Sequence, residues 1–307
     1  MFIERRPINL PSSTSMTWSI IEAPSTLGLS PSGVQDLPDA LRAAGLDAGL
    51  RAHGSVRVEP APYDDRRDHE TSLLNPVALV DYTRRLADAV GASLDRGERP
   101  LVLGGDCSIL LGNLLALARR GRYGLLFLDG HADFYQPEAN VNGQAASSEL
   151  AFATGRGPTL LTCFDDYYPL IRDEQIVALG IRDAAEAAAY GSQPLPASLR
   201  AYDLSTSRRL GIDRATTQAL EHLRGCPDGI WIHFDADVLD DDVMPAVDYR
   251  LPGGLSWAEA ERILSTALAG GAIVGMDVTI FNPRLDPDNS IARSLVDSLI
   301  RALGPSD

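Results

Sequence analysis

The sequence has few cysteines, few cations and no long hydrophobic run, and each deficit excludes a class of protein. Three cysteines in 307 residues cannot build a disulfide framework, so we expect a reducing compartment. The 42 Asp and Glu residues outnumber the 27 Lys and Arg residues, and the net charge of −15 argues against a nucleic-acid partner. No run of about 18 apolar residues suggests a membrane span, and residues 1–15 lack the apolar core of a signal peptide. We therefore expect a cytoplasmic protein with no membrane partner.

The chain instead alternates apolar strand patterns with amphipathic helix patterns from residue 17 to the C-terminus. Strands are predicted near residues 17–23, 54–59, 100–104, 124–129, 175–180, 198–202, 230–235 and 272–279. Helices are predicted at 36–48, 76–96, 107–120, 212–224, 256–268 and 289–303. This alternation indicates a parallel sheet covered on both faces. Because no linker interrupts it, we predict an N-terminal surface arm at residues 1–15 and one α/β domain at residues 16–307.

Two of the predicted strands end in acidic residues at alternate positions. The first is followed by Asp129, His131 and Asp133, and the second ends in Asp235 and Asp237. Side chains at every second position of a strand share a face, and ligands of parallel sheets bind beyond the carboxyl ends of the strands. Aspartates also cap strand ends without binding anything. Two acidic strand ends with a histidine in register nevertheless predict a two-metal site, because cations offset the repulsion between crowded carboxylates.

A third strand end, Gly104-Gly105-Asp106-Cys107-Ser108, leads directly into a predicted helix. The glycines permit a tight turn and close backbone approach, and Asp106 or Ser108 can cap the helix. By itself, such a turn is more often structural than functional.

Taken together, the three strand ends resemble the motifs of the ureohydrolase family, which includes arginases, agmatinases and formiminoglutamases. The family motifs are GGDHS, DAHxD, and DxDxxDP followed by PGG, and their counterparts here are Gly104–Ser108, Asp129–Asp133, Asp235–Asp240 and Pro252–Gly254. The resemblance extends from about residue 17 to the end of the chain. It implies a three-layer α/β/α arginase-like fold with a mostly eight-stranded parallel sheet, two divalent ions that are usually manganese, and a homo-oligomer, commonly a trimer or hexamer.

The same resemblance implies roles for individual residues. The implied ligands are Cys107, Asp129, Asp133 and Asp235 for one ion, and Asp129, His131, Asp235 and Asp237 for the other. A hydroxide generated near neutral pH would attack a planar C=N carbon, and Asp133 would also orient that hydroxide.

Four positions depart from the family pattern. Cys107 replaces a histidine ligand, and a thiolate favours zinc, iron or cobalt over manganese; the cysteine is a ligand, a spectator or a nucleophile. Asn142 stands where arginases place a proton-shuttling histidine, and an amide cannot shuttle a proton. Ile280 replaces the glutamate that pairs with the substrate guanidinium. Asp241 replaces the proline of the DxDxxDP motif, which reshapes a loop.

The resemblance implies a metal-dependent hydrolase that cleaves a C–N bond in a small amidine or guanidine-like substrate. The departures favour a modified guanidine such as N-hydroxyarginine over arginine. Two alternatives stay open. One is a non-catalytic arginase-fold protein that binds a metal or ligand. The other is a mononuclear deacetylase-like amidohydrolase that keeps only a set like Asp129, His131 and Asp237. His233 either supports a metal ligand from behind or is a satisfied structural histidine, and Glu149 is a candidate without a mechanism.

Overall fold

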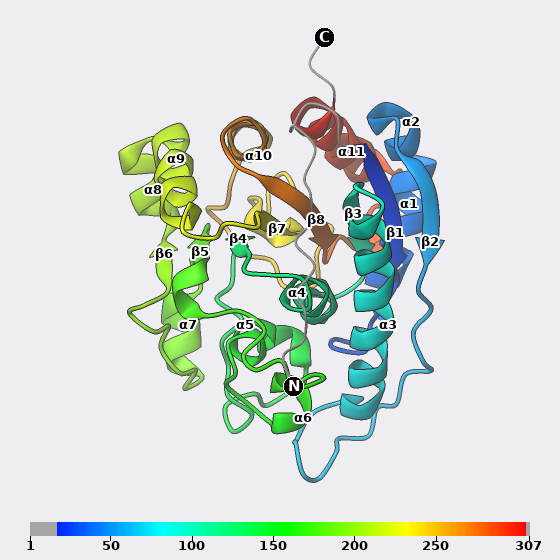
Figure 1. Cartoon of the computed structure of the whole chain (residues 1–307), viewed down its shortest axis with the longest axis vertical. Coiled ribbons are helices and arrows are strands. Elements are labelled where there is room, and N and C mark those ends of the chain that lie inside the picture. Colours follow the sequence, from blue (N-terminus) through cyan, green and yellow to red (C-terminus); the bar gives the residue numbers. More distant parts are fainter. Residues whose placement is uncertain (1–16, 305–307) are drawn as a thin grey trace.

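The computed structural model describes residues 17–304, and an eight-stranded parallel sheet runs through its centre (Figure 1). The strand order is β2-β1-β3-β8-β7-β4-β5-β6, and every neighbouring pair is parallel. The strands are β1 Trp18–Ala23, β2 His53–Arg57, β3 Arg99–Gly104, β4 Gly124–Leu128, β5 Ile176–Leu179, β6 Arg200–Tyr202, β7 Ile230–Asp235 and β8 Ile273–Thr279.

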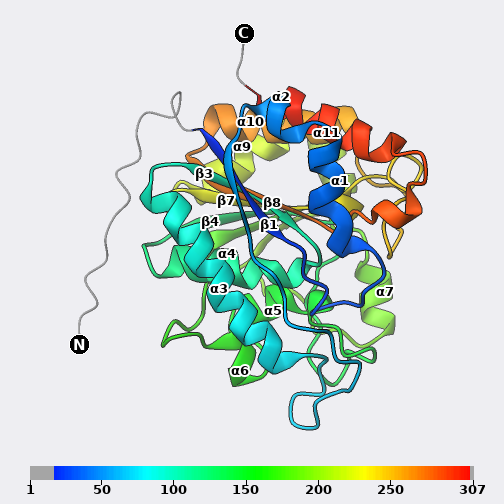
Figure 2. The ribbon, with the colours of Figure 1, turned by 90° about the vertical axis from the view of Figure 1, so that its right-hand side faces the viewer.

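Helices cover both faces of the sheet, which makes the three layers that the sequence predicted (Figure 2). The layer on one face consists of α3 Pro76–Asp95, α4 Leu110–Ala118, α5 Glu149–Ala153 and α6 Thr159–Thr162. The layer on the other face consists of α1 Leu37–Ala43, α2 Leu46–Leu50, α8 Leu204–Leu210, α9 Ile212–Leu223, α10 Trp257–Gly270 and α11 Ser290–Leu303. The short helix α7, Ala184–Ala189, follows β5. Within residues 17–304, none of the helices has the length and apolar character that crossing a membrane requires.

The sheet is buried because its central strands are apolar on both faces. All residues of β3, β4, β7 and β8 are buried, and the hydrophobic core divides into one cluster on each side of the sheet. Helix α10 begins with a capping box, in which Ser256 accepts a hydrogen bond from the Glu259 amide and Glu259 accepts one from the Ser256 amide. Continuous apolar strands between amphipathic helices are therefore the physical basis of the fold.

The prediction of eight strands in a three-layer α/β fold is confirmed, whereas the single helix predicted at 36–48 is interrupted. That segment forms two short helices, because Gly45 between them adopts φ +99° and ends the first one. Helices α5 to α8 have between four and seven residues, too few for a helical period to stand out in the sequence. The surface arm predicted at residues 1–15 lies outside the described residues.

The strand order brings together the strand ends that carry the motifs. Strands β3, β8, β7 and β4 are consecutive neighbours, so their carboxyl ends form one edge of the sheet. Strands β4 and β7 pair directly, with Leu128 opposite Phe234, although about a hundred residues separate them in the chain. The predicted metal-binding residues follow these ends.

Candidate metal centre

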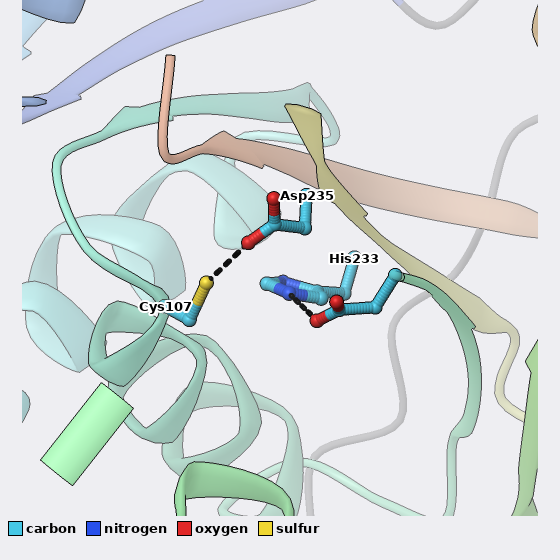
Figure 3. A group of neighbouring side chains, drawn as sticks. Cys107, His233 and Asp235 are labelled. Atoms are coloured by element: carbon cyan, nitrogen blue, oxygen red, sulfur yellow. Dashed lines mark hydrogen bonds and ion pairs between the residues drawn. The ribbon is translucent and has the colours of Figure 1, made fainter. Parts of the chain in front are cut away.

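The turn after β3 directs Cys107 into the sheet edge. A Cβ atom on Gly105 would lie 1.7 Å from the carbonyl oxygen of Ser25, so only glycine allows this close approach. Asp106 caps the following turn by accepting a hydrogen bond from the amide of Ser108 at 2.9 Å. Cys107 is buried, and its thiol donates a hydrogen bond to Asp235 Oδ2 at 2.7 Å (Figure 3).

The loop after β4 brings an imidazole against two carboxylates. His131 Nδ1 lies 2.9 Å from Asp237 Oδ2, and the amide of His131 donates to Asp129 Oδ1 at 2.7 Å. Asp133 has a positive φ of 44°, an uncommon conformation for a residue other than glycine. The chain is thus no longer a regular strand here, and the three residues reach the centre through a turn.

The end of β7 supplies the other two acids. Asp235 accepts a hydrogen bond from the amide of Asp237 at 2.7 Å, which holds the turn in shape. Arg182 supports this turn by donating to the carbonyl oxygens of Asp237, at 2.7 Å, and of Leu239, at 3.1 Å. This arginine was not predicted from the sequence, and it positions the acids through the backbone.

The crowding of these groups changes their protonation. Burial and the charge of Asp237 raise the pKa of Asp129 from 3.8 to about 6. Burial and the carboxylate of Asp235 raise the pKa of the Cys107 thiol well above its ordinary value. Burial opposes protonation of His131, but Asp237 and neighbouring acids outweigh it and raise the pKa of this histidine. Without cations the centre therefore holds protons, and Cys107 is a thiol rather than a thiolate.

The donor atoms fit divalent cations. Among the described residues, no partner exists for several fully buried polar atoms: Asp129 Oδ2, both carboxylate oxygens of Glu149, and His233 Nε2. Native proteins rarely leave such atoms unpaired, and bound ions would satisfy them. Three sets at the centre have donor atoms within 4.8 Å of one another: Asp129, His131 and Asp237; Cys107, Asp129, Asp133 and Glu149; and Cys107, Asp129, His233 and Asp235. The structure thus brings together all six predicted ligands.

A cavity of about 250 Å³ opens above the centre. Its lining includes both residues predicted to contact substrate, Asn142 and Ile280. The Asn142 amide is held by Gln144, whose Oε1 accepts hydrogen bonds from Asn142 at 2.9 Å and from Tyr249 at 2.8 Å. Ile280 has a φ of +69°, which is strained for a β-branched side chain.

Two further residues, Glu149 and His233, lie in the centre beside the six predicted ligands. Glu149, at the start of α5, is fully buried beside Asp133, and burial together with neighbouring carboxylates raises its pKa well above the ordinary value. The Nε2 atom of His233 lies 3.8 Å from Asp129 Oδ2. His233 precedes Asp235 by two residues, so their shared strand face was the available signal.

Several other titratable residues lie outside the centre. Arg156 pairs with Asp173, and Asp165 pairs with Arg84 and Arg119. His53, His69 and His222 are exposed.

Comparison with known proteins identifies one family. The sequence profile of the Arginase family matches residues 16–304. The arginase of Bacillus caldovelox is 31% identical over 297 residues, covering 92% of this chain and 97% of the relative. An arginase of Staphylococcus aureus (strain MRSA252) is 29% identical over 288 residues, covering 90% of this chain and 93% of the relative. The solved B. caldovelox arginase superimposes with a TM-score of 0.84 at 28% identity, covering 95% of this chain and 99% of that one. The formimidoylglutamase of Bacillus subtilis, at 20% identity with a TM-score of 0.72 over 95% of this chain and 88% of that one, shares the fold.

Proposed function

Since the chain belongs to the arginase family of hydrolases, we propose that it is a two-metal hydrolase of a C–N bond in a neutral or weakly basic amidine or guanidine-like small molecule. A modified guanidine such as N-hydroxyarginine fits this description better than arginine. The ions would be bound by Cys107, Asp129, His131, Asp133, Asp235 and Asp237.

One observation carries the metal-dependent part of the proposal. Acids from the ends of β4 and β7, the Cys107 thiol and two imidazoles converge below one cavity, and buried carboxylate and imidazole atoms are left without partners in the described chain. Unpaired buried charge is costly, so a site of this kind is stable with cations in it. Divalent ions, when bound, lower the pKa of water and so supply a nucleophile near neutral pH. Manganese is the usual ion of the family, and the soft Cys107 donor also suits zinc, iron or cobalt.

The protein's own residues would position the attacking water. Asp133 lines the cavity and lies next to Glu149, and in the ion-free protein burial and the charge of Glu149 raise the pKa of Asp133 well above its ordinary value. Bound ions would favour the ionised carboxylate, because ligands lose their protons when metal binds. Asp133 is therefore proposed as the catalytic residue that accepts a hydrogen bond from the water and orients it, with Glu149 behind it.

The substrate preference rests on what surrounds the acids in the cavity. Asn142, Tyr249 and Ile280 line it and are neutral, and Asn142 and Tyr249 already share the Gln144 oxygen as their acceptor. A guanidinium ion would find no carboxylate at position 280, and the amide of Asn142 cannot protonate a leaving amine. These features support a substrate that needs neither a guanidinium partner nor a histidine shuttle.

Metal analysis followed by a substrate panel tests the proposal. Protein purified without chelators should contain two divalent ions per chain. Loaded with manganese or zinc, it should release negligible urea from arginine or agmatine while hydrolysing an N-hydroxyguanidine, a formimino compound or an acylated guanidine. Arginine turnover at ordinary enzymatic rates, about 1–1000 per second, would contradict the substrate class.

The same measurement addresses the other candidate functions. One tightly held ion per chain would favour the deacetylase-like alternative, and bound ions without turnover of any amidine would favour a binding protein. A homo-oligomer, such as a trimer or hexamer, is part of the proposal and can be checked by light scattering. A cytoplasmic location stays a prediction.

A further inference from the structure

His233 is a buried histidine with one nitrogen bonded and the other free. It lies on β7 with no exposed surface, and its ring stacks on Phe127 with centroids 4.8 Å apart. Nε2 has no hydrogen-bond partner among the described residues. A buried ring nitrogen without a partner is uncommon in native proteins and points to a missing ligand.

The other nitrogen is firmly oriented. His233 Nδ1 lies 2.5 Å from Asp277 Oδ2, on the neighbouring strand β8. Asp277 Oδ1 accepts two further hydrogen bonds, from Trp231 Nε1 at 2.5 Å and from Asn113 Nδ2 at 2.9 Å. Because Asp277 is an acceptor on both oxygens, the imidazole proton belongs on Nδ1, which leaves Nε2 with a free lone pair.

That lone pair is in the cluster on the Cys107 side of the centre. The donor atoms of Cys107, Asp129, His233 and Asp235 all lie within 4.8 Å of one another. Figure 3 shows the His233 ring between Cys107 and the strand that carries Asp235. One sulfur, one nitrogen and two carboxylates are a donor set that suits a tetrahedral ion such as zinc.

We propose that His233 is a direct ligand of the ion on the Cys107 side, so that this chain obtains its imidazole from β7 rather than from position 107. The inference rests on the proposed metal centre and adds a ligand to it. Asp277, His233 and the ion would form the carboxylate–histidine–metal arrangement in which the carboxylate fixes the tautomer and the ring orientation. With Cys107 also in the set, this ion should be zinc-like in preference, whereas the ion held by His131 has mainly oxygen ligands.

The competing explanation is an ion pair without a metal. His233 as an imidazolium could pair with Asp277 at 2.5 Å and with Asp129 at 3.8 Å, and its positive charge would then replace that of a cation. The two explanations predict opposite effects of removing the ring. Loss of a ligand weakens metal binding, whereas loss of a nearby positive charge strengthens it.

His233→Asn separates the two, because the shorter amide can keep the hydrogen bond to Asp277 and lacks an atom at the Nε2 position. Titrating the full chain with zinc and with manganese in a calorimeter measures the affinity for each ion. For the ligand role, one of the two zinc affinities should fall by more than the roughly 10–100-fold that follows loss of a residue that only orients a ligand. The affinity of the second ion should change far less.

Two further variants are matched controls. Asp277→Asn retains the imidazole and removes its orienting carboxylate, so it should weaken the same ion by only about 10–100-fold. His222→Asn alters an exposed histidine in the last turn of α9 that belongs to none of the candidate ligand sets, and it should change neither affinity.

Zinc X-ray absorption of the wild-type protein needs no variant and serves if His233→Asn does not fold. With His131 and His233 both bound, the spectrum should show one imidazole per zinc on average; with His131 alone, it should show one for every two ions. The lower value, or zinc affinities that are unchanged or tighter in His233→Asn, would overturn the ligand role while leaving the two-metal proposal in place. A wild-type chain that binds no divalent ion would overturn both.

Discussion

Asp129 is the acid that both proposed ions would share, and it has no exposed surface. Its pKa is raised from 3.8 to about 6 by burial and by the charge of Asp237, which means that the folded protein resists ionising it. Above pH 6 the carboxylate is nevertheless charged. In the absence of ions it therefore lowers the stability of the fold that holds it.

Asp129→Asn should consequently have opposite effects with and without metal. In chelator-treated protein at pH 8, we expect unfolding to cost about 1–3 kcal/mol more than in the wild type, since about two pKa units of unfavourable ionisation are removed at 1.36 kcal/mol each. In metal-loaded protein, stability and metal content should fall, because a shared ligand is lost. Urea unfolding monitored by circular dichroism measures both.

The control for this substitution is Asp88→Asn, at an exposed acid that pairs with Arg119 on the surface. It should leave both forms within about 0.5 kcal/mol of the wild type. If chelator-treated Asp129→Asn is less stable than the wild type at pH 8, the repulsion argument fails.

Ile280 is the second residue whose side chain we examine by substitution, because we propose that it excludes guanidinium from the cavity. It lines the cavity in a left-handed conformation, and its amide donates to the carbonyl oxygen of Gly105 at 2.9 Å. A backbone bond of this kind holds the side chain in place, so a different side chain at this position should also face the cavity.

Ile280→Glu should therefore create a binding site for guanidinium in the metal-loaded protein. A carboxylate next to the bound guanidinium is worth about 2 kcal/mol or more, so arginine or guanidine should bind roughly 30-fold more tightly than to the wild type. Isothermal titration calorimetry measures the change. Ile280→Gln, which has the same shape without the charge, is the control, and equal affinities for the two variants would refute the assignment of position 280 to guanidinium binding.

At the scale of elements, the turn between β3 and α4 connects three parts of the site edge. Gly105 touches the Ser25 carbonyl after β1 and accepts a hydrogen bond from Ile280 after β8. Asp106 also accepts from the amide of Gly28 at 3.1 Å. Cys107 is thus held by backbone contacts to neighbouring strand ends as well as by its own helix.

Gly105→Ala should disrupt this connection. The added Cβ would lie 1.7 Å from a backbone oxygen that cannot move aside cheaply, so we expect a loss of about 1–3 kcal/mol in the free energy of unfolding, together with weaker metal binding. Gly225→Ala is the matched control, since a Cβ there meets nothing within 4 Å, and it should be neutral or slightly stabilising. Equal unfolding midpoints in urea for the two variants would show that the turn accommodates the added methyl group.

The elements also show what can be predicted from a sequence. All eight strands were predicted, because apolar runs such as Leu101–Leu103 are long enough to identify buried strands. The short helices α5 to α8 were not, because a few residues do not reveal a period. The convergence of the six proposed ligands followed from their position after strand ends. The free nitrogen of His233 could not be predicted, since it depends on the register that sets His233 opposite Asp277.

For the whole molecule, the buried centre should make stability depend on pH in a direction that metal reverses. The raised pKa of Asp129 means that its contribution is fully present below pH 3.8 and is lost as the pH rises through about 6. The pKa of His233 is raised because Asp277 and Asp129 outweigh the opposing effect of burial, so its contribution is present below pH 6.5 and is also lost as the pH rises. Both groups therefore make the ion-free protein less stable as the pH rises.

Chelator-treated protein should accordingly be less stable at pH 8 than at pH 5.5. Asp129 alone accounts for a difference on the order of 1 kcal/mol, and the histidines add to it. Metal-loaded protein should show the opposite trend, because the ligands must lose their protons before ions bind. Thermal unfolding at the two pH values, with and without chelator, tests both trends. Greater stability of the chelated form at pH 8 would contradict the assignment of repulsion to the centre.

The distribution of the acids over separate strands also bears on how long the protein survives in a cell. The proposed ligands come from residues 107 to 237, so the centre exists only after β3, β7 and β4 have assembled, and bound ions would stabilise only the finished fold. By mass action, scarce metal leaves a larger fraction of chains transiently unfolded. Proteases cut that fraction, so the abundance of this protein should follow the supply of its ions, and regulation of metal uptake would also regulate the enzyme.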